Sequence, residues 1–386
     1  MSASARNRVI YQSEALFVSE DAMSTGSGKH EQLERIQSAN YGFNISREEV
    51  YCYGKLGKLG SMVLEAPTVS FDTSYLVTDG FNERALGFYV GTGTGGSNPA
   101  HAYVEKSFVS GHIASESGKN IYIATVPEGK DATINITGSL NNAAVPKQSV
   151  IGLGNAYLTD YSLDLSVGSL PTVSATFEAA NIRSTDNVSG LATPAVTIAS
   201  GEQARPDSEI IVLPSGNTGQ SDLVALRPGD IAVKIGDAQG DVMVDIDDGD
   251  PSEAVHIQSA SLSIPLSRSP LEKLGTKFAY ARVVDFPVQA TLSVNAIVNE
   301  VTSKNLASVI DQTGVHTLDL ELKSESSSVA MLYRIKGAEL ISESFSSSIG
   351  SNKSVDLTFT TTIGALNDTE NGVFVSGANR SGVYTP

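Results

Sequence analysis

A stretch near the start of this chain returns roughly 220 residues later, and this repetition limits what the chain can fold into. Ile36-Gln37-Ser38-Ala39 occurs again as Ile257-Gln258-Ser259-Ala260, an offset of 257 − 36 = 221. After a gap of three, Leu56-Gly57 matches Leu274-Gly275 at 274 − 56 = 218. Self-similarity at a long period indicates duplicated structural units, and two copies are too few for a solenoid. The sequence therefore predicts two fused domains of one kind.

A second repeated block lies near the end of each copy. Val167-Gly168-Ser169 matches Ile349-Gly350-Ser351, with 350 − 168 = 182. The offset falls because residues 87–120 have no counterpart, so we expect an inserted loop or hairpin there. The expected division is a first domain at 1–182, a connector rich in Ser, Pro and Gly at 183–220, and a second domain at 221–386.

Alternation of apolar and polar residues predicts that both copies are mainly β. Ala39, Tyr41, Phe43 and Ile45 alternate with polar or small residues, which is the period of a half-buried strand. The second block predicts a hairpin around Gly168-Ser169, with one apolar and one polar face. Each copy also has one short helix candidate, at residues 82–86 and 303–310.

Charge and cysteine content exclude several classes of protein. The formal net charge is −17, so the chain as a whole repels nucleic acid. Cys52 is the only cysteine, which excludes an intramolecular disulfide. No apolar run is long enough to span a bilayer, and residues 1–8 are polar, so we expect that they are not a secretory signal. We expect a protein made in a cytoplasm, without a membrane as partner.

No motif in the sequence predicts a catalytic, metal or cofactor site. Gly91, Gly93 and Gly96 satisfy G-x-G-x-x-G, but no βαβ pattern surrounds them, so a flexible loop is favoured. The acids around Gly249 fail the EF-hand spacing, and a solvated acidic turn is favoured over a weak divalent site. The five histidines lie in separate contexts, and Cys52 lies between two tyrosines. We therefore expect a protein that is not an enzyme and carries no cofactor.

The remaining signal is architectural. Two like domains on one chain suit a ring, in which three chains imitate six single-domain subunits, because closed cyclic symmetry satisfies repeated interfaces. An acidic pore through such a ring would not bind DNA tightly, since affinity for DNA increases with the number of phosphates that the protein neutralises.

Several stretches resemble the major tail proteins of tailed bacteriophages, which form the tail tube. They are residues 8–16, Ile36-Gln37-Ser38-Ala39-Asn40-Tyr41, residues 159–182 with the Val167-Gly168-Ser169-Leu170-Pro171 turn, and Leu226-Arg227-Pro228-Gly229-Asp230-Ile231. The resemblance implies two tandem β-sandwich or barrel domains, each with one helix, and stacked pseudo-hexameric trimer rings around a DNA channel for genome ejection.

The partners implied by the resemblance are further copies of the chain, a tape-measure protein, tail terminator proteins and, in a contractile tail, a sheath. The location implied is the virion tail, assembled in the host cytoplasm. DNA would pass through the lumen without specific binding. The resemblance leaves open whether the tail contracts, whether rings are trimeric or hexameric, whether both domains line the lumen, and what residues 87–120 do.

The polar face of the two late hairpins supplies the candidate lumen-facing acids Asp164, Glu178 and Asp356. These positions alternate with apolar residues and have no Lys or Arg among them, although Lys353 lies in the second turn. An ordinary solvated outer face is the alternative interpretation. For the whole protein, the alternative functions are a virion decoration or surface-binding protein and a virion hydrolase.

Overall fold

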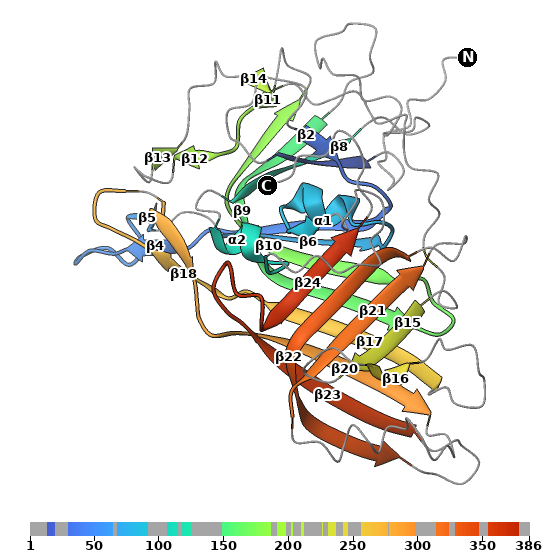
Figure 1. Cartoon of the computed structure of the whole chain (residues 1–386). Helices are drawn as coiled ribbons and strands as arrows, with labels where there is room; N and C mark the ends of the chain where they lie inside the picture. The colour runs from blue at the N-terminus through green and yellow to red at the C-terminus, as the bar shows by residue number, and fades with distance from the viewer. Residues whose placement is uncertain are drawn as a thin grey trace, which may run out of the picture.

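The computed structural model confirms a mainly β fold with a large antiparallel sheet (Figure 1). It describes residues 14–19, 30–64, 68–91, 106–114, 118–125, 149–186, 191–197, 202–203, 210–211, 226, 231–236, 242–245, 256–276, 278–297, 314–323, 329–346 and 354–377. The expected helix at 303–310, most of the acidic turn around Gly249 and most of the Gly91–Gly96 motif lie outside these residues.

Seven strands from the N-terminal half form one run, which we call the first unit. In spatial order they are β2 (His30–Gln32), β1 (Glu14–Ser19), β8 (Lys119–Thr125), β9 (Ser149–Ser166), β10 (Thr172–Asp186), β6 (Thr68–Leu76) and β3 (Ile36–Asn44). Every pairing between neighbours in this run is antiparallel.

The C-terminal half repeats this order, and we call it the second unit. Its strands are β16 (Val242–Asp245), β15 (Ile231–Gly236), β21 (His316–Lys323), β22 (Val329–Ser346), β23 (Ser354–Ile363), β20 (Val288–Ile297) and β17 (His256–Pro265). Here the counterpart of β10 is divided, because β24 (Gly372–Gly377) continues β23 along β22 after an eight-residue interruption (372 − 363 − 1).

Strand irregularities also recur at matching positions. Gln37 is the extra residue of a β-bulge between β3 and β6, and Gln258 is the extra residue between β17 and β20. Thr159 bulges from β9 against β10, and Ile341 bulges from β22 against β23, with 341 − 159 = 182. A bulge bends its strand and changes the direction of nearby side chains, so a bulge at a matching position is a structural feature of both units. The repeated Ile-Gln-Ser-Ala motif is therefore a bulge motif.

The two units are joined edge to edge into one 16-stranded sheet, because β17 pairs antiparallel with the far half of β9. Their apolar faces share one core. The Tyr161 hydroxyl of the first unit and the Tyr333 hydroxyl of the second form a buried hydrogen bond of 2.8 Å. Phe88 and Phe108 lie in the region between β6 and β8. Their rings are stacked with centres 4.4 Å apart, and both pack edge-on against Tyr161.

The helix predicted at 82–86 is confirmed as α1 (Phe81–Leu86). Within the region expected to be an inserted loop or hairpin lie β7 (Val90–Gly91), which pairs in parallel with β24, and a second short helix, α2 (Ser110–Ala114). Four two-residue strands follow β10: β11 (Leu191–Ala192), β12 (Val196–Thr197), β13 (Glu202–Gln203) and β14 (Ile210–Ile211). β10 itself runs to Asp186, past residue 182, and the three-part domain division stays a prediction.

Each unit carries a separate hairpin after its bulged strand. In the first unit β4 (Arg47–Val50) pairs with β5 (Gly60–Val63), and in the second β18 (Arg268–Leu271) pairs with β19 (Ala281–Val284). Both turns contain a left-handed glycine, Gly54 at φ 84° and Gly275 at φ 91°, with 275 − 54 = 221. The expected gap of three is therefore wrong, because the turn glycines and both hairpin ends keep one offset.

One buried acid makes folding depend on pH. Burial raises the pKa of Glu83 on α1 to about 7 from its ordinary 4.5, and the charge of Asp79 adds to this rise. The folded state therefore favours the protonated carboxyl. The penalty for ionising Glu83 is absent below about pH 4.5, grows as pH rises toward 7 and is constant above it.

We predict that Glu83→Gln removes this dependence. As the pH rises from 5 to 8, wild type should lose about 2 to 3 kcal/mol of unfolding free energy relative to the variant, because glutamine has no proton to lose. Urea unfolding at both pH values measures the difference. An equal stability difference at the two pH values would contradict the assignment.

Candidate assembly interface

The junction between the units is a continuous strand pairing with buried side chains. Leu262 of β17 lies opposite Leu163 of β9, and these side chains are 1% and 0% exposed. At the two ends of the pairing, the Leu266 N–H donates to the Thr159 carbonyl at 2.8 Å and the Val167 N–H donates to the Gln258 carbonyl at 2.9 Å. Backbone groups and apolar side chains thus both hold the units together.

The β18–β19 hairpin adds cationic contacts to the same junction. Arg268 donates to the His112 carbonyl at 2.6 Å, and its guanidinium lies 5.1 Å from the centre of the Tyr157 ring. Arg282 forms an ion pair with Glu178. Burial lowers the pKa of Arg268 from its ordinary value, and the neighbouring Arg282 adds to the decrease. The hairpin of the second unit therefore binds the surface of the first.

The equivalent edge of the first unit has exposed side chains. β3 corresponds to β17, yet among the described residues only β6 pairs with it. Tyr41 is 42% exposed and Phe43 is 59% exposed, whereas their counterparts Leu262 and Ile264 are 1% and 0% exposed. An exposed aromatic edge strand is a template for pairing with another chain.

The C-terminal part of β22, beyond the residues that pair with β21, forms a second exposed edge. In the described part of the chain, residues 339–346 of β22 pair with β23 on one side, and no strand pairs on the side that β17 occupies along β9. Phe345 is 50% exposed, while its counterpart Leu163 is buried. β3 and residues 339–346 of β22 are thus two edges that are each equivalent to one partner of the internal junction.

The β4–β5 hairpin carries a cluster of exposed apolar side chains. Tyr51 is 62% exposed, Met62 is 64% exposed, and Leu59 is 54% exposed. In Figure 1 this hairpin lies on the same side of the sheet as β18. Large exposed apolar clusters mark interaction surfaces in soluble proteins.

Eight strand segments lie side by side between the two uncovered edges, in the order β22, β23, β20, β17, β9, β10, β6, β3; we call them the eight-strand row. One face packs on the core and the other is polar. One line of neighbours across the polar face consists of Ser342, Thr358, Ser293, Ser261, Asp164 and Thr172. The row consists of residues 339–346 of β22, 160–166 of β9, 172–180 of β10 and the whole of β23, β20, β17, β6 and β3. None of these segments contains Lys or Arg.

All three candidate acids lie on strands of the row. Asp164 and Asp356 are exposed, and Asp356 accepts a hydrogen bond of 2.6 Å from the Asn295 amide. Glu178 is half-buried because the β18–β19 hairpin supplies Arg282 as its partner. Whether these side chains face a lumen stays a prediction.

Sequence patterning missed further acids of this face, among them Asp72, Asp160 and Glu339. Asp72 on β6 is exposed and accepts a hydrogen bond of 2.9 Å from the Thr176 hydroxyl, across the strand. Asp160 lies opposite Thr176, and partial burial raises the pKa of its carboxyl. The alternation around Asp72 was visible in the sequence, but only the pairing of β6 with β10 places it beside the others.

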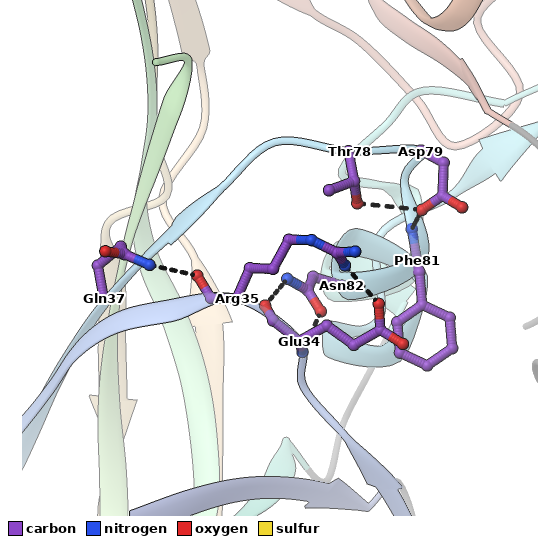
Figure 2. A network of polar contacts seen from close by, with 7 residues as sticks. All are labelled: Glu34, Arg35, Gln37, Thr78, Asp79, Phe81 and Asn82. Carbon is purple, nitrogen blue, oxygen red and sulfur yellow. Dashed lines mark hydrogen bonds and ion pairs between the residues drawn. The ribbon is translucent and has the colours of Figure 1, made fainter. Parts of the chain in front are cut away.

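A polar network fixes the start of β3 (Figure 2). Asn82 of α1 donates to the Glu34 carbonyl at 2.7 Å and accepts from the Glu34 N–H at 2.9 Å, and both bonds are buried. The bulge residue Gln37 donates to the Arg35 carbonyl at 3.1 Å, and Arg35 has a left-handed φ of 54°. α1 thereby sets where the exposed edge strand begins.

The other sequence candidates do not form a site. Among the described residues, no group of three or more His, Cys, Asp and Glu side chains could hold a metal ion. Cys52 is exposed on the hairpin, and buried His112 packs against Phe88. None of the described helices combines the length and apolar character needed to cross a membrane.

Comparison with known proteins gives only distant matches. No protein-family model and no curated protein sequence matches the chain. Among solved structures, a chain of the anti-feeding prophage baseplate, six-fold symmetrised, has 14% identity and a TM-score of 0.29, covering 42% of this chain and 99% of its own. A chain from the tail of an empty GTA particle has 12% identity and a TM-score of 0.26, covering 36% and 96%.

A third similar structure is a doubly substituted Hcp1 protein from E. coli EAEC 042, with 10% identity and a TM-score of 0.20, covering 38% and 97%. Each of the three neighbours is thus matched over nearly its full length by less than half of this chain.

We predict that Asn82→Ala destabilises the fold by about 2 to 4 kcal/mol, because the buried N–H and carbonyl of Glu34 both lose the partner that Asn82 supplies. Gln37→Ala is the matched control, since it removes one exposed bond of the same network and should cost less than about 1 kcal/mol. Urea denaturation measures both. Equal losses in the two variants would contradict the role given to Asn82.

Proposed function

We propose that this chain is the structural subunit of a bacteriophage tail tube, in which stacked rings of three chains enclose a DNA channel for genome ejection. The supporting observation is the eight-strand row: two units of the same strand order lie side by side with one polar face. A row made of repeated units closes when the rotation between units completes a circle. Three chains would contribute 3 × 8 = 24 strands to the inner wall.

The chemistry of the polar face supports a conduit for DNA. Its side chains are mainly hydroxyls and amides with scattered acids, and Asp164 and Asp356 are the exposed candidates for the lumen. Binding to duplex DNA depends on cations that neutralise phosphates and release counterions. The strands of this wall carry no such cations, and Arg282, which reaches the wall from the β18–β19 hairpin, is paired with Glu178. Such a wall would let DNA pass without holding it.

The resemblance of the sequence to major tail proteins supplies the rest of this proposal. A tape-measure protein would occupy the lumen during assembly in the host cytoplasm, terminator proteins would cap the tube, and a sheath would surround it in a contractile tail. The protein would have no enzymatic activity of its own. The exposed hairpins of both units, on one side of the sheet, would contact the next ring.

Negative-stain imaging of concentrated purified protein tests the proposal. We expect hollow rings or tubes with three-fold symmetry that approximates six-fold. Compact monomers under all conditions would instead support a virion decoration or surface-binding protein.

We predict that the double variant Asp164→Lys, Asp356→Lys makes assembled tubes bind short duplex DNA, whereas wild-type tubes do not. Each ring would gain six cations (3 × 2) in its wall, so binding should weaken steeply as salt increases. Co-sedimentation of labelled duplex with tubes measures this. Glu370→Lys is the control, because its exposed carboxylate lies on the loop after β23, outside the row. Binding by the control alone would contradict the assignment of the lumen face.

A further inference from the structure

We propose that copies of this chain join by strand pairing, with the outer side of β3 in one copy antiparallel to residues 339–346 of β22 in the next. The register is the one that β17 and β9 use within the chain. This inference deepens the proposed ring by identifying its lateral interface, and it rests on the correspondence of the two units.

The correspondence fixes which residues meet. β3 maps onto β17 with an offset of 221, and this half of β22 maps onto β9 with an offset of 182. The internal pair Leu262–Leu163 therefore becomes Tyr41–Phe345 between copies (262 − 221 and 163 + 182). The internal pair Ser261–Asp164 becomes Asn40–Ser346.

Exposure of the two edges supports a partner of this kind. Tyr41 and Phe345 are 42% and 50% exposed, while the internal residues at the same positions are buried. Natural edge strands are usually protected by lysine, proline or a covering element. β3 contains no charged residue and no proline, whereas residues 339–346 contain no lysine or proline but carry Glu339 and Glu343. Pairing would cover both aromatic side chains and continue the antiparallel strand ladder from one copy to the next.

A charge pair supports the same register independently. Within the chain, Arg268 of β18 lies over the ring of Tyr157. Arg47 of β4 corresponds to Arg268 (47 + 221), and Glu339 corresponds to Tyr157 (157 + 182). Arg47 and Glu339 are both exposed in the single chain. Docking in the internal register brings this arginine to a carboxylate of the next copy.

The interface is head-to-tail, since two different edges meet. Such an interface repeats from copy to copy until a ring closes. A symmetric dimer through two β3 edges would leave the second edge uncovered, and so would a strand from another protein on either edge. Cysteine cross-linking distinguishes both from the proposed pairing.

Cysteine cross-linking tests the register. The internal Ser261–Asp164 pair lies between hydrogen-bonded pairs, as the bonds at Leu266 and Val167 require, so its Cα atoms are close, about 4.5 Å in such pairs. That distance suits a disulfide. In a Cys52→Ser background, Asn40→Cys with Ser346→Cys should give, on oxidation, multimers of the 40.4-kDa chain on a non-reducing gel.

The matched control combines Asn40→Cys with Ser344→Cys. These cysteines lie on the same face but two residues out of register, about 7 to 8 Å apart, which is too far for a disulfide. Preferential cross-linking of the control, or dimers from Asn40→Cys alone, would overturn the proposed pairing. Rings without cross-links would overturn it and leave the tube function standing. Cross-linked multimers without rings would support the pairing and contradict the tube.

Charge reversal tests the ionic contact. Arg47→Glu or Glu339→Arg alone should raise the protein concentration needed for assembly by about fivefold or more, because each places like charges together. The double variant should restore assembly to near the wild-type concentration. Light scattering against concentration measures this, and a double variant as defective as the two singles combined would overturn the contact.

Discussion

The pairing of β17 with β9 is the interaction on which the rest of the structure depends. It converts two seven-strand runs into one sheet and merges their apolar faces into one core. The pairing also buries side chains such as Leu163 and Ile264 that alternation alone would leave on an open edge. β17 has a counterpart in β3, and β9 has one in β22. The junction therefore shows which kind of strand would fit the exposed edge of β3 and that of residues 339–346.

The bulges fix the register of strand pairing within each unit. A strand can slip by two residues without changing which face is apolar, so alternation alone does not fix pairing. A bulge breaks that freedom, because the extra residue occupies one place in the ladder. Gln37 and Gln258 hold that place in the two units, and Thr159 and Ile341 hold a second one. The repeated glutamine thus occupies the bulge position in both units, although the two halves differ at most other positions.

Much of the β architecture was predictable from the sequence, while contacts between distant segments were not. Alternation around Tyr41 and Phe43 predicts a half-buried strand; β3 is a strand, but the predicted half-burial is wrong, because Tyr41 and Phe43 are both exposed. Alternation is the same in β17, so it gives no sign that Tyr41 is exposed and Leu262 is buried; only the neighbouring strand decides this. The arginine partner of Glu178 is 104 residues away, in a hairpin whose docking no local pattern reveals.

The hairpin alignment shows the limit of matching letters. Leu56-Gly57 and Leu274-Gly275 look alike, but the glycine that must turn the first hairpin is Gly54, because its φ is positive there. Backbone conformation, and not residue identity, establishes the correspondence.

The differences between the two units follow from the stage at which each interface forms. The internal junction forms as one chain folds, so it can use buried apolar groups such as Tyr161 and Leu163. On the proposed arrangement, the edge between copies must stay in water until a partner arrives. Its positions accordingly hold Glu343 and Phe345, and Glu339 replaces Tyr157. Charges on an exposed edge limit indiscriminate strand pairing, while complementary charges select one partner and one orientation. Fusing two units therefore allows the internal junction to stabilise the folded chain, while the edges between copies stay in water until assembly.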